Sequence, residues 1–240
     1  MQSMRAAYDK GQRPENARIS FVDVHEHRAQ YDNPETDTLP KLLKHLVAEI
    51  DAGPAPALWV SRIGGNEHNM LSLLEHDRPI DFILPGHEHL GLQDGAEIVT
   101  CAYIREVVST RLERNLKYLP EILEFCPVPL IQVQAPPPIG DTDHILNNLG
   151  AFGKNLTGTP RIAANAFRWK VWRLQSQLTE EFCRGLEVPF LENPDPVFSD
   201  GGFLRDDLLG RDPTHGNRKY GQIMNDLIVQ IARGEAEVPA

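Results

Sequence analysis

The sequence contains little cysteine, no excess of basic residues and no long hydrophobic run. Its three cysteines, Cys101, Cys126 and Cys183, are isolated, which favours reduced core thiols over a zinc ribbon or a disulfide framework. The net charge of −10 excludes the basic face of a non-specific nucleic-acid binder. No apolar run approaches the ~20 residues that cross a membrane, and the N-terminal residues lack the apolar core of a signal peptide. We therefore expect a soluble, cytoplasmic protein that contacts neither nucleic acid nor membrane.

Apolar runs and amphipathic patterns alternate along the chain. The short apolar runs predict strands over 19–24, 57–62, 128–134 and 188–193, with 80–85 as a short strand or extended segment. The amphipathic patterns predict helices over 1–11, 39–53, 102–125 (interrupted at Pro120), 160–186 (with Pro160 at its start and Gly185 near its end) and 217–234. Strands that are apolar throughout and alternate with helices predict an α/β fold, with a mainly parallel sheet covered on both faces. We expect one domain over 1–240, with its ligand site at the C-terminal ends of the strands.

Histidine pairs permit a metal-site interpretation. The segments VDVHEH (22–27), GGNEH (64–68) and PGHEH (85–89) resemble the metallophosphoesterases. That resemblance would make metal ligands of Asp23, His25, Asn66, His87 and His89. The fit is incomplete, because no Gly-Asp segment lies between 27 and 64 and Glu67 stands where that family has its catalytic His. VDVHEH also resembles the amidohydrolase His-x-His, whose later ligands have no counterparts here. We favour a site without metal or cofactor.

A second candidate lies near the C-terminus, in DPTHGN (212–217). Asp212 and His215 are three residues apart in a Pro-containing turn before the last predicted helix. A turn can point both side chains the same way, so that the carboxylate orients the imidazole as a general base. The ordinary alternative is that Asp212 starts a turn and Asn217 caps the helix.

Together, the Gly-Gly-Asn segment after a strand and the late Asp-x-x-His resemble the SGNH (GDSL-like) hydrolases. The segments GGNEHN, DFILP, VQAPPPIGD and DPTHGN are similar to a bacterial subgroup of that superfamily. The resemblance implies a flavodoxin-like, three-layer α/β/α fold and a serine ester hydrolase or acyl transferase that acts on a small-molecule or glycan ester. Asp212 and His215 match its last block, and Gly65 and Asn66 match its Asn block. The Asn66 amide would donate into the oxyanion hole, where the loss of one donor typically costs ~3 kcal/mol of barrier.

Two parts of the SGNH pattern are absent. No Gly-Asp-Ser occurs in the sequence, and residues 22–52 contain no glycine that could supply a backbone amide. The helix predicted over 1–11 resembles the one that follows the nucleophile, so we expect the nucleophilic Ser and the first central strand to be missing from this chain. Unpaired backbone groups in a sheet cost ~1–3 kcal/mol each. We therefore expect a gap, a rearranged edge or a strand exchanged with another chain, the oligomeric state being open.

Other hydroxyl and thiol groups fit the nucleophile position poorly. Ser3 lies one turn too late in the first predicted helix, and Ser61 and Ser199 lack a flanking motif. Cys101 precedes a predicted helix, where a thiol can gain acidity. If no serine serves the site, the resemblance leaves a non-catalytic module that binds an acylated or glycan ligand.

Aromatic residues are concentrated in the predicted helix over 160–186. Phe167, Trp169 and Trp172, with Arg173, could line a glycan-binding face, but helical spacing of this kind favours core packing.

Overall fold

The structure is a computed structural model that describes residues 2–11, 17–21, 56–126, 128–154 and 158–238. The helix predicted over 39–53 and the residues Asp23 and His25 lie outside these described residues. No helix in the described ranges is long and apolar enough to cross a membrane.

The main sheet is parallel and is built from three of the predicted strands. Its strands are β1 (Trp59–Ser61), β4 (Leu130–Val133) and β5 (Phe190–Leu191), in the order β1-β4-β5. Val60 pairs with Ile131, and Val133 pairs with Leu191. The strands predicted over 57–62, 128–134 and 188–193 are therefore confirmed, with shorter hydrogen-bonded cores.

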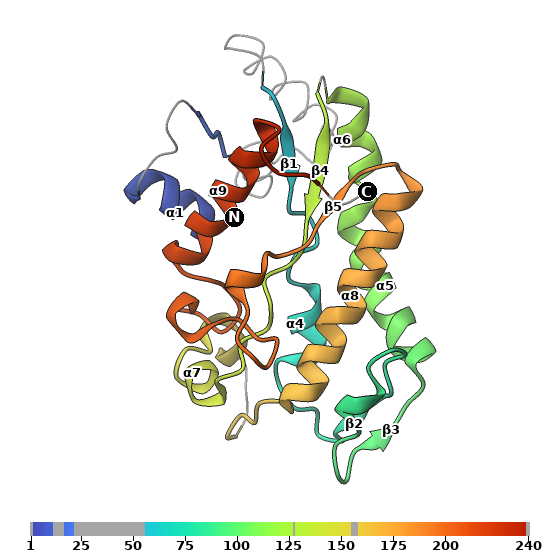
Figure 1. Cartoon of the computed structure of the whole chain (residues 1–240). Helices are drawn as coiled ribbons and strands as arrows, with labels where there is room; N and C mark the ends of the chain where they lie inside the picture. The colour runs from blue at the N-terminus through green and yellow to red at the C-terminus, as the bar shows by residue number, and fades with distance from the viewer. Residues whose placement is uncertain (1, 12–16, 22–55, 127, 155–157, 239–240) are drawn as a thin grey trace, which may run out of the picture.

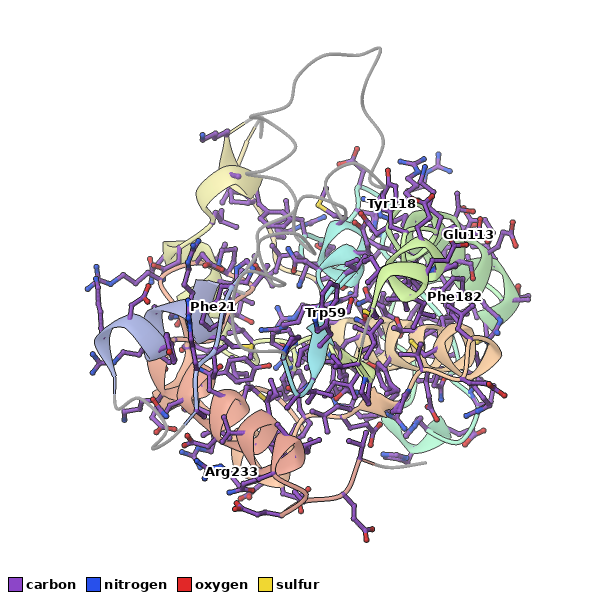
Figure 2. The ribbon with its side chains drawn as sticks, turned by 90° about the horizontal axis from the view of Figure 1, so that it is seen from above. Phe21, Trp59, Glu113, Tyr118, Phe182 and Arg233 are labelled. Carbon is purple, nitrogen blue, oxygen red and sulfur yellow. The ribbon has the colours of Figure 1, made fainter. Side chains whose placement is uncertain are left out.

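Helices cover both faces of this sheet, as Figures 1 and 2 show. One face carries α1 (Gln2–Lys10) and α9 (Arg218–Ala232), and the other carries α5 (Cys101–Leu116), α6 (Leu119–Phe125) and α8 (Asn165–Gly185). Successive strand residues point to opposite faces. Ile131 and Val133 accordingly join the core under α9, whereas Leu130 packs with α6. The predicted three-layer α/β/α architecture is confirmed.

Shorter elements occupy the loops. These are α4 (Glu67–Ser72), α7 (Thr142–Asn147), the parallel pair β2 (Ile80–Asp81) and β3 (Glu97–Ile98), and the 3-10 turns η1 (Glu88–Leu90), η2 (Gly150–Gly153), η3 (Asp195–Val197) and η4 (Asp206–Leu208). The segment over 80–85 is thus a two-residue strand that pairs outside the main sheet.

One helix boundary differs from the sequence prediction, and one predicted interruption is confirmed. The helix predicted from Pro160 begins at Asn165, because the residues before it are extended: Glu75 N donates to Arg161 O (2.9 Å) and Ala163 N to Leu73 O (3.2 Å). The predicted interruption of the 102–125 pattern at Pro120 is confirmed: the pattern forms two helices, and Pro120 lies in the first turn of α6, where its missing N–H costs nothing.

The edge of β1 that faces away from β4 bears on the predicted missing strand. In the described ranges, β1 pairs with a strand on its β4 side only. The strand predicted over 19–24 is wrong for residues 19–21, which form no strand. A strand there needs a neighbour to pair with; Phe21 instead packs against Tyr8 of α1, with ring centroids 5.8 Å apart. Among the described residues β1 is therefore an edge strand, and the absence of the first central strand stays a prediction.

Candidate functional site

Asp212 and His215 form a hydrogen-bonded pair in the turn before α9. His215 Nδ1 lies 2.9 Å from Asp212 Oδ1, and both side chains are 39% exposed. The same oxygen accepts from the backbone N–H groups of Thr214 and His215, both at 2.9 Å. Backbone hydrogen bonds of the turn thus hold the Asp212 carboxylate next to the imidazole of His215, and the contact of the two side chains is the one that the Asp-x-x-His spacing predicts.

Two glycines allow this turn to close. Gly210 N donates to His215 O (2.8 Å), and Leu209 bridges Gly216 in antiparallel fashion. A Cβ atom on Gly210 would lie 2.4 Å from His215 O, so any other residue would open the turn. Asn217 then caps α9, since its side chain accepts from Lys219 N (2.8 Å) and Tyr220 N (3.3 Å). The predicted capping role of Asn217 is confirmed, and it coexists with the pair.

The electrostatics of the pair suit a general base. Burial would raise the pKa of Asp212, but hydrogen bonds from His215 and Thr214, with the charge of His215, lower it to about 2. Asp212 is therefore ionised near neutral pH and accepts the Nδ1 proton. The other ring nitrogen, Nε2, makes no hydrogen bond within the described part of the chain. Nε2 can therefore accept a proton from a hydroxyl group that approaches it.

An open pocket of about 520 Å³ adjoins the pair. It is lined by Ser3 and Ala6 of α1, by Leu209, Gly210, Arg211, Asp212, His215, Gly216 and Asn217 of the turn, and by Arg218 of α9. Helix α1 is seated on α9: Asn225 Nδ2 donates to Met4 O (2.9 Å), and a Cβ atom on Gly221 would lie 2.0 Å from Ser3 O. The first turn of α1 therefore borders the pocket that holds Asp212 and His215.

Side chains at the C-terminal ends of the strands link these elements to the sheet. Gln134, after β4, accepts through Oε1 from Asn193 N (2.8 Å) after β5, and Tyr220 of α9 donates its hydroxyl to Asn193 Oδ1 (2.8 Å). At the end of β1, Arg62 Nη1 donates to Met4 Sδ (3.1 Å). The predicted site edge thus carries contacts from β1, β4, β5, α1 and α9.

Asn66 and Gly65 lie in the loop between β1 and α4. Asn66 occupies the N-cap position of α4, but its side chain makes no capping hydrogen bond. Its Oδ1 instead accepts from Asn69 Nδ2 (2.6 Å), and its Nδ2 has no partner among the described residues. Glu67 anchors α4 to α5 by accepting from Arg111 Nε (3.1 Å) and Asn115 Nδ2 (3.0 Å). The Asn66 amide is therefore held through its oxygen, with its N–H groups left to donate.

The structure brings some of the predicted residues together and not others. Asp212 and His215 are in contact, and both line the pocket; Gly65 and Asn66 do not line it. The charge of His215 contributes only a small part of the lowering of the pKa of His68, two residues after Asn66, and no contact joins the two blocks among the described residues. A role of Asn66 in the same reaction stays a prediction.

The histidines of the metal interpretation do not form a cluster in the described residues. His87 and His89 have ring centroids 6.1 Å apart, and the described ranges hold no group of three His, Cys, Asp or Glu side chains that could bind a metal ion. Asp23 and His25 lie outside those ranges, so the metal interpretation is untested.

Most of the aromatic residues of α8 are core residues. Phe167 and Trp172 are buried, as the helical spacing predicts. Trp169 is partly buried, packs edge-on against His87 at 4.9 Å and donates through Nε1 to Gly202 O (3.2 Å). Arg173 pairs with Glu192 at 2.7 Å. A glycan-binding face along this helix has no support from these contacts.

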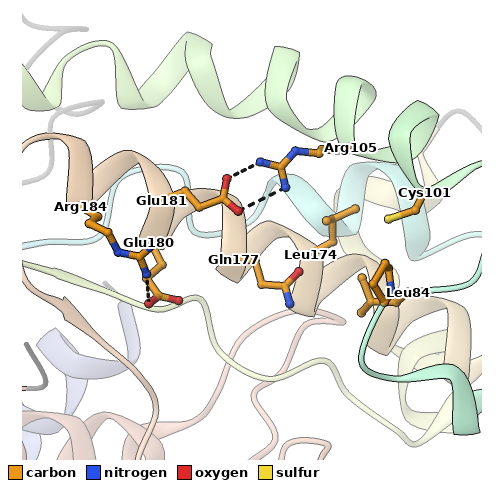
Figure 3. Close-up of a pocket in the computed structure, with 9 residues that line it drawn as sticks. Leu84, Cys101, Arg105, Leu174, Gln177, Glu180, Glu181 and Arg184 are labelled. Carbon is orange, nitrogen blue, oxygen red and sulfur yellow. Dashed lines mark hydrogen bonds and ion pairs between the residues drawn. The ribbon is translucent and has the colours of Figure 1, made fainter.

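The candidate nucleophiles differ in their surroundings. Ser3 borders the pocket, whereas Ser61 is buried and its Oγ accepts from Ile63 N (3.4 Å). Cys101 begins α5 as expected, but burial raises its pKa and Arg105 offsets this only in part, so the predicted gain in acidity is wrong. Cys101 lines a separate recess of about 310 Å³ between α5 and α8, rimmed by the ion pairs Arg105–Glu181 and Arg184–Glu180 (Figure 3). That recess contains none of the predicted site residues.

Three residues that support Asn66 were not predicted from the sequence: His68, Asn69 and Gln175. Asn69 lies one helical turn after Asn66, and that spacing was a usable signal. Gln175 is 107 residues from His68 along the chain, and no local pattern indicates the contact.

Comparison with known proteins gives only distant similarities. No protein-family model matches the sequence, and neither does any curated protein. Among solved structures, a proposed acylhydrolase of Bacteroides fragilis NCTC 9343 is similar with 14% identity and a TM-score of 0.34; the match covers 65% of this chain and 61% of that one. A GDSL-like lipase of Bacteroides thetaiotaomicron VPI-5482 is similar with 11% identity and a TM-score of 0.38, over 81% of this chain and 98% of that one. This chain thus spans less than two thirds of the first neighbour, and at these TM-scores neither likeness bears on the chemistry.

Proposed function

We propose that the chain forms the acyl-transfer site of an SGNH-type serine ester hydrolase or acyl transferase. The observation that carries the proposal is the Asp212–His215 pair, whose Nε2 is unengaged in the described residues and whose pocket is bordered by the first turn of α1. A serine hydrolase needs an imidazole that is oriented by a carboxylate and has its other nitrogen free to reach the nucleophile. The sequence resemblance supplies the class, and the geometry supports the roles of Asp212 and His215, whereas the role of Asn66 rests on the resemblance.

The proposed mechanism uses a serine that precedes α1 and is not one of the 240 residues. Its hydroxyl oxygen attacks the ester carbonyl carbon while His215 Nε2 takes the hydroxyl proton. Asp212 stabilises the imidazolium, and Asn66 Nδ2 donates to the oxyanion. The alcohol leaves with the proton from His215, and the acyl-enzyme is then cleaved by water or by an acceptor alcohol. The proposed substrate is a small-molecule or glycan ester, which the sequence resemblance implies.

The test is cleavage of a short chromogenic ester by the natural gene product, including any residues encoded before Met1. We expect His215→Ala to lower kcat by about 10³-fold or more, because the base is lost. Ser3→Ala should leave kcat unchanged if the nucleophile precedes α1. His89→Ala is the matched control, since His89 lies outside the pocket. Unchanged turnover by His215→Ala would sink the assignment.

A non-catalytic binding module is the second candidate. It is favoured by one observation: no serine or cysteine side chain of the described residues hydrogen-bonds His215 Nε2. Calorimetric binding of an acetylated oligosaccharide by the natural gene product, without release of acetate, would assign this function. Activity that is lost on chelation, with bound metal found by elemental analysis, would instead support the metal-dependent phosphoesterase.

A further inference from the structure

Asn69 connects Asn66 to the interior of the protein through a single amide nitrogen. Asn69 Nδ2 lies 2.6 Å from Asn66 Oδ1 and 2.9 Å from His68 Nε2. A primary amide nitrogen carries two hydrogens. Both are therefore used, one on the Asn66 oxygen and one on the imidazole nitrogen.

The imidazole of His68 accepts at one nitrogen and donates at the other. Nε2 faces the Asn69 amide nitrogen, and Nδ1 faces Gln175 Oε1 at 3.2 Å. A carbonyl oxygen cannot donate, so Nδ1 carries the proton and Nε2 does not. The hydrogen bonds around His68 are satisfied by one neutral tautomer.

The backbone fixes the orientation of Gln175. Its Oε1 accepts from His68 N (2.5 Å), and its Nε2 donates to Gly64 O (3.1 Å). A flipped amide would set two donors against each other at His68 and two acceptors against each other at Gly64. The backbone groups His68 N and Gly64 O thus fix the Gln175 amide, and this in turn fixes the donor and acceptor at each step from Gln175 through His68 and Asn69 to Asn66.

We propose that Gln175, His68 and Asn69 are positioning residues, which turn the Asn66 amide so that its nitrogen, and not its oxygen, is presented as the free group. The importance of this orientation rests on the proposed function, in which Asn66 is an oxyanion donor. An amide oxygen at the same place would repel a developing oxyanion instead of stabilising it.

Burial and charge keep His68 in the form that this order of donors and acceptors requires. His68 is 2% exposed, and its hydrogen-bond partners among the described residues are the Gln175 and Asn69 amides and Ser72, whose Oγ donates to His68 O (2.8 Å). Burial lowers the pKa of His68 to about 4; the Gln175 bond opposes this shift and the charge of His215 adds to it. Protonation of Nε2 would turn the Asn69 oxygen toward His68, and Asn66 would then offer its oxygen.

The test is ¹⁵N NMR of the full chain, with the His68 ring nitrogens and the side-chain amides of Asn66 and Asn69 assigned. At pH 7 we expect a neutral ring protonated at Nδ1, and a coupling across the hydrogen bond from Asn69 Nδ2 to His68 Nε2. The Asn66 amide hydrogens should exchange with water faster than those of Asn69. A ring protonated at Nε2 would overturn the proposal, and so would an Asn69 amide that exchanges as fast as that of Asn66.

Gln175→Glu is the informative variant, because a carboxylate next to Nδ1 favours the doubly protonated ring. The titration of His68 should shift upward, and the Asn66 and Asn69 amide signals should change with it. Gln177→Glu is the matched control, because it makes the same substitution on α8 in the recess that Cys101 lines. It should change neither the titration of His68 nor the amide signals of Asn66 and Asn69. If Gln175→Glu does not fold, the His68 tautomer and the amide exchange rates of the unaltered chain still test the proposal.

Activity separates this inference from the proposed function. In a turnover assay, Gln175→Glu should lower kcat by roughly 10²-fold with little change in KM, as for a lost oxyanion donor. If the unaltered chain has the predicted His68 tautomer but Gln175→Glu leaves kcat unchanged, the oxyanion role of Asn66 is refuted and the positioning by Gln175, His68 and Asn69 stands. The wrong tautomer refutes the positioning whatever the activity.

Discussion

Lys170 Nζ lies 2.6 Å from Asp81 Oδ1, and both side chains are 1% exposed. The ammonium group also donates to Phe82 O (2.8 Å) and Gly91 O (3.0 Å). Asp81 in turn accepts from Phe82 N and Gln93 N, each at 2.8 Å. This buried pair joins α8 to the segment that carries β2 and η1.

We expect Lys170→Met to destabilise the protein by about 3–5 kcal/mol, because it leaves an uncompensated carboxylate in the core. Urea unfolding followed by circular dichroism measures the effect. Arg105→Met is the control: it breaks a half-exposed ion pair with Glu181, and should cost less than about 1 kcal/mol. Equal effects of the two substitutions would show that burial does not set the energy of the Lys170–Asp81 pair.

His68 should make stability depend on pH. Its pKa is about 4 in the folded chain and ~6.5 when unfolded. Between these values the unfolded chain binds a proton that the folded chain does not, so stability falls as pH falls from 6.5 to 4. The full loss is about 3 kcal/mol. We expect His68→Gln to flatten this part of the pH profile in urea titrations, whereas the exposed His76→Gln should retain it.

Asp212 should contribute stability in a lower pH window. Its folded pKa, about 2, lies below the unfolded value of ~3.9. The contribution is therefore complete above about pH 4 and is lost as pH falls through 2. The difference in unfolding free energy between the native chain and Asp212→Asn should shrink over that window. A difference that is constant from pH 6 to pH 2 would contradict the charge-stabilised pair.

Gly221 should be required for α1 to pack closely against α9. Any Cβ atom there would lie 2.0 Å from Ser3 O, so Gly221→Ala must push α1 away from α9. We expect a loss of about 1–3 kcal/mol, with faster hydrogen exchange of the α1 amides by mass spectrometry. Gly185→Ala, at the end of α8, has open space around the new methyl group and should change stability by less than about 0.5 kcal/mol. Unaltered exchange in α1 would show that its contact with α9 does not hold it.

Local patterns in the sequence predicted most of the described elements and one half of the candidate site. The apolar runs that became β1, β4 and β5 are short and bounded, and the periodicity of α8 and α9 is strong. Asp212 and His215 contact each other because three residues of one turn separate them. The start of α8 was predicted too early, because the bridge between Leu74 and Ile162 joins segments far apart in the sequence.

The sequence by itself determined the α/β class, the order of the main elements and the pairing of Asp212 with His215, since each depends on neighbours along the chain. Only the tertiary structure decided that the first turn of α1 borders the pocket of that pair, and that Gln175 orients the Asn66 amide through His68 and Asn69. His68 and Gln175 are 107 residues apart, and the direction of the hydrogen bonds between them depends on which backbone groups the packing of the chain brings next to Gln175. Residue spacing alone carries no record of that arrangement.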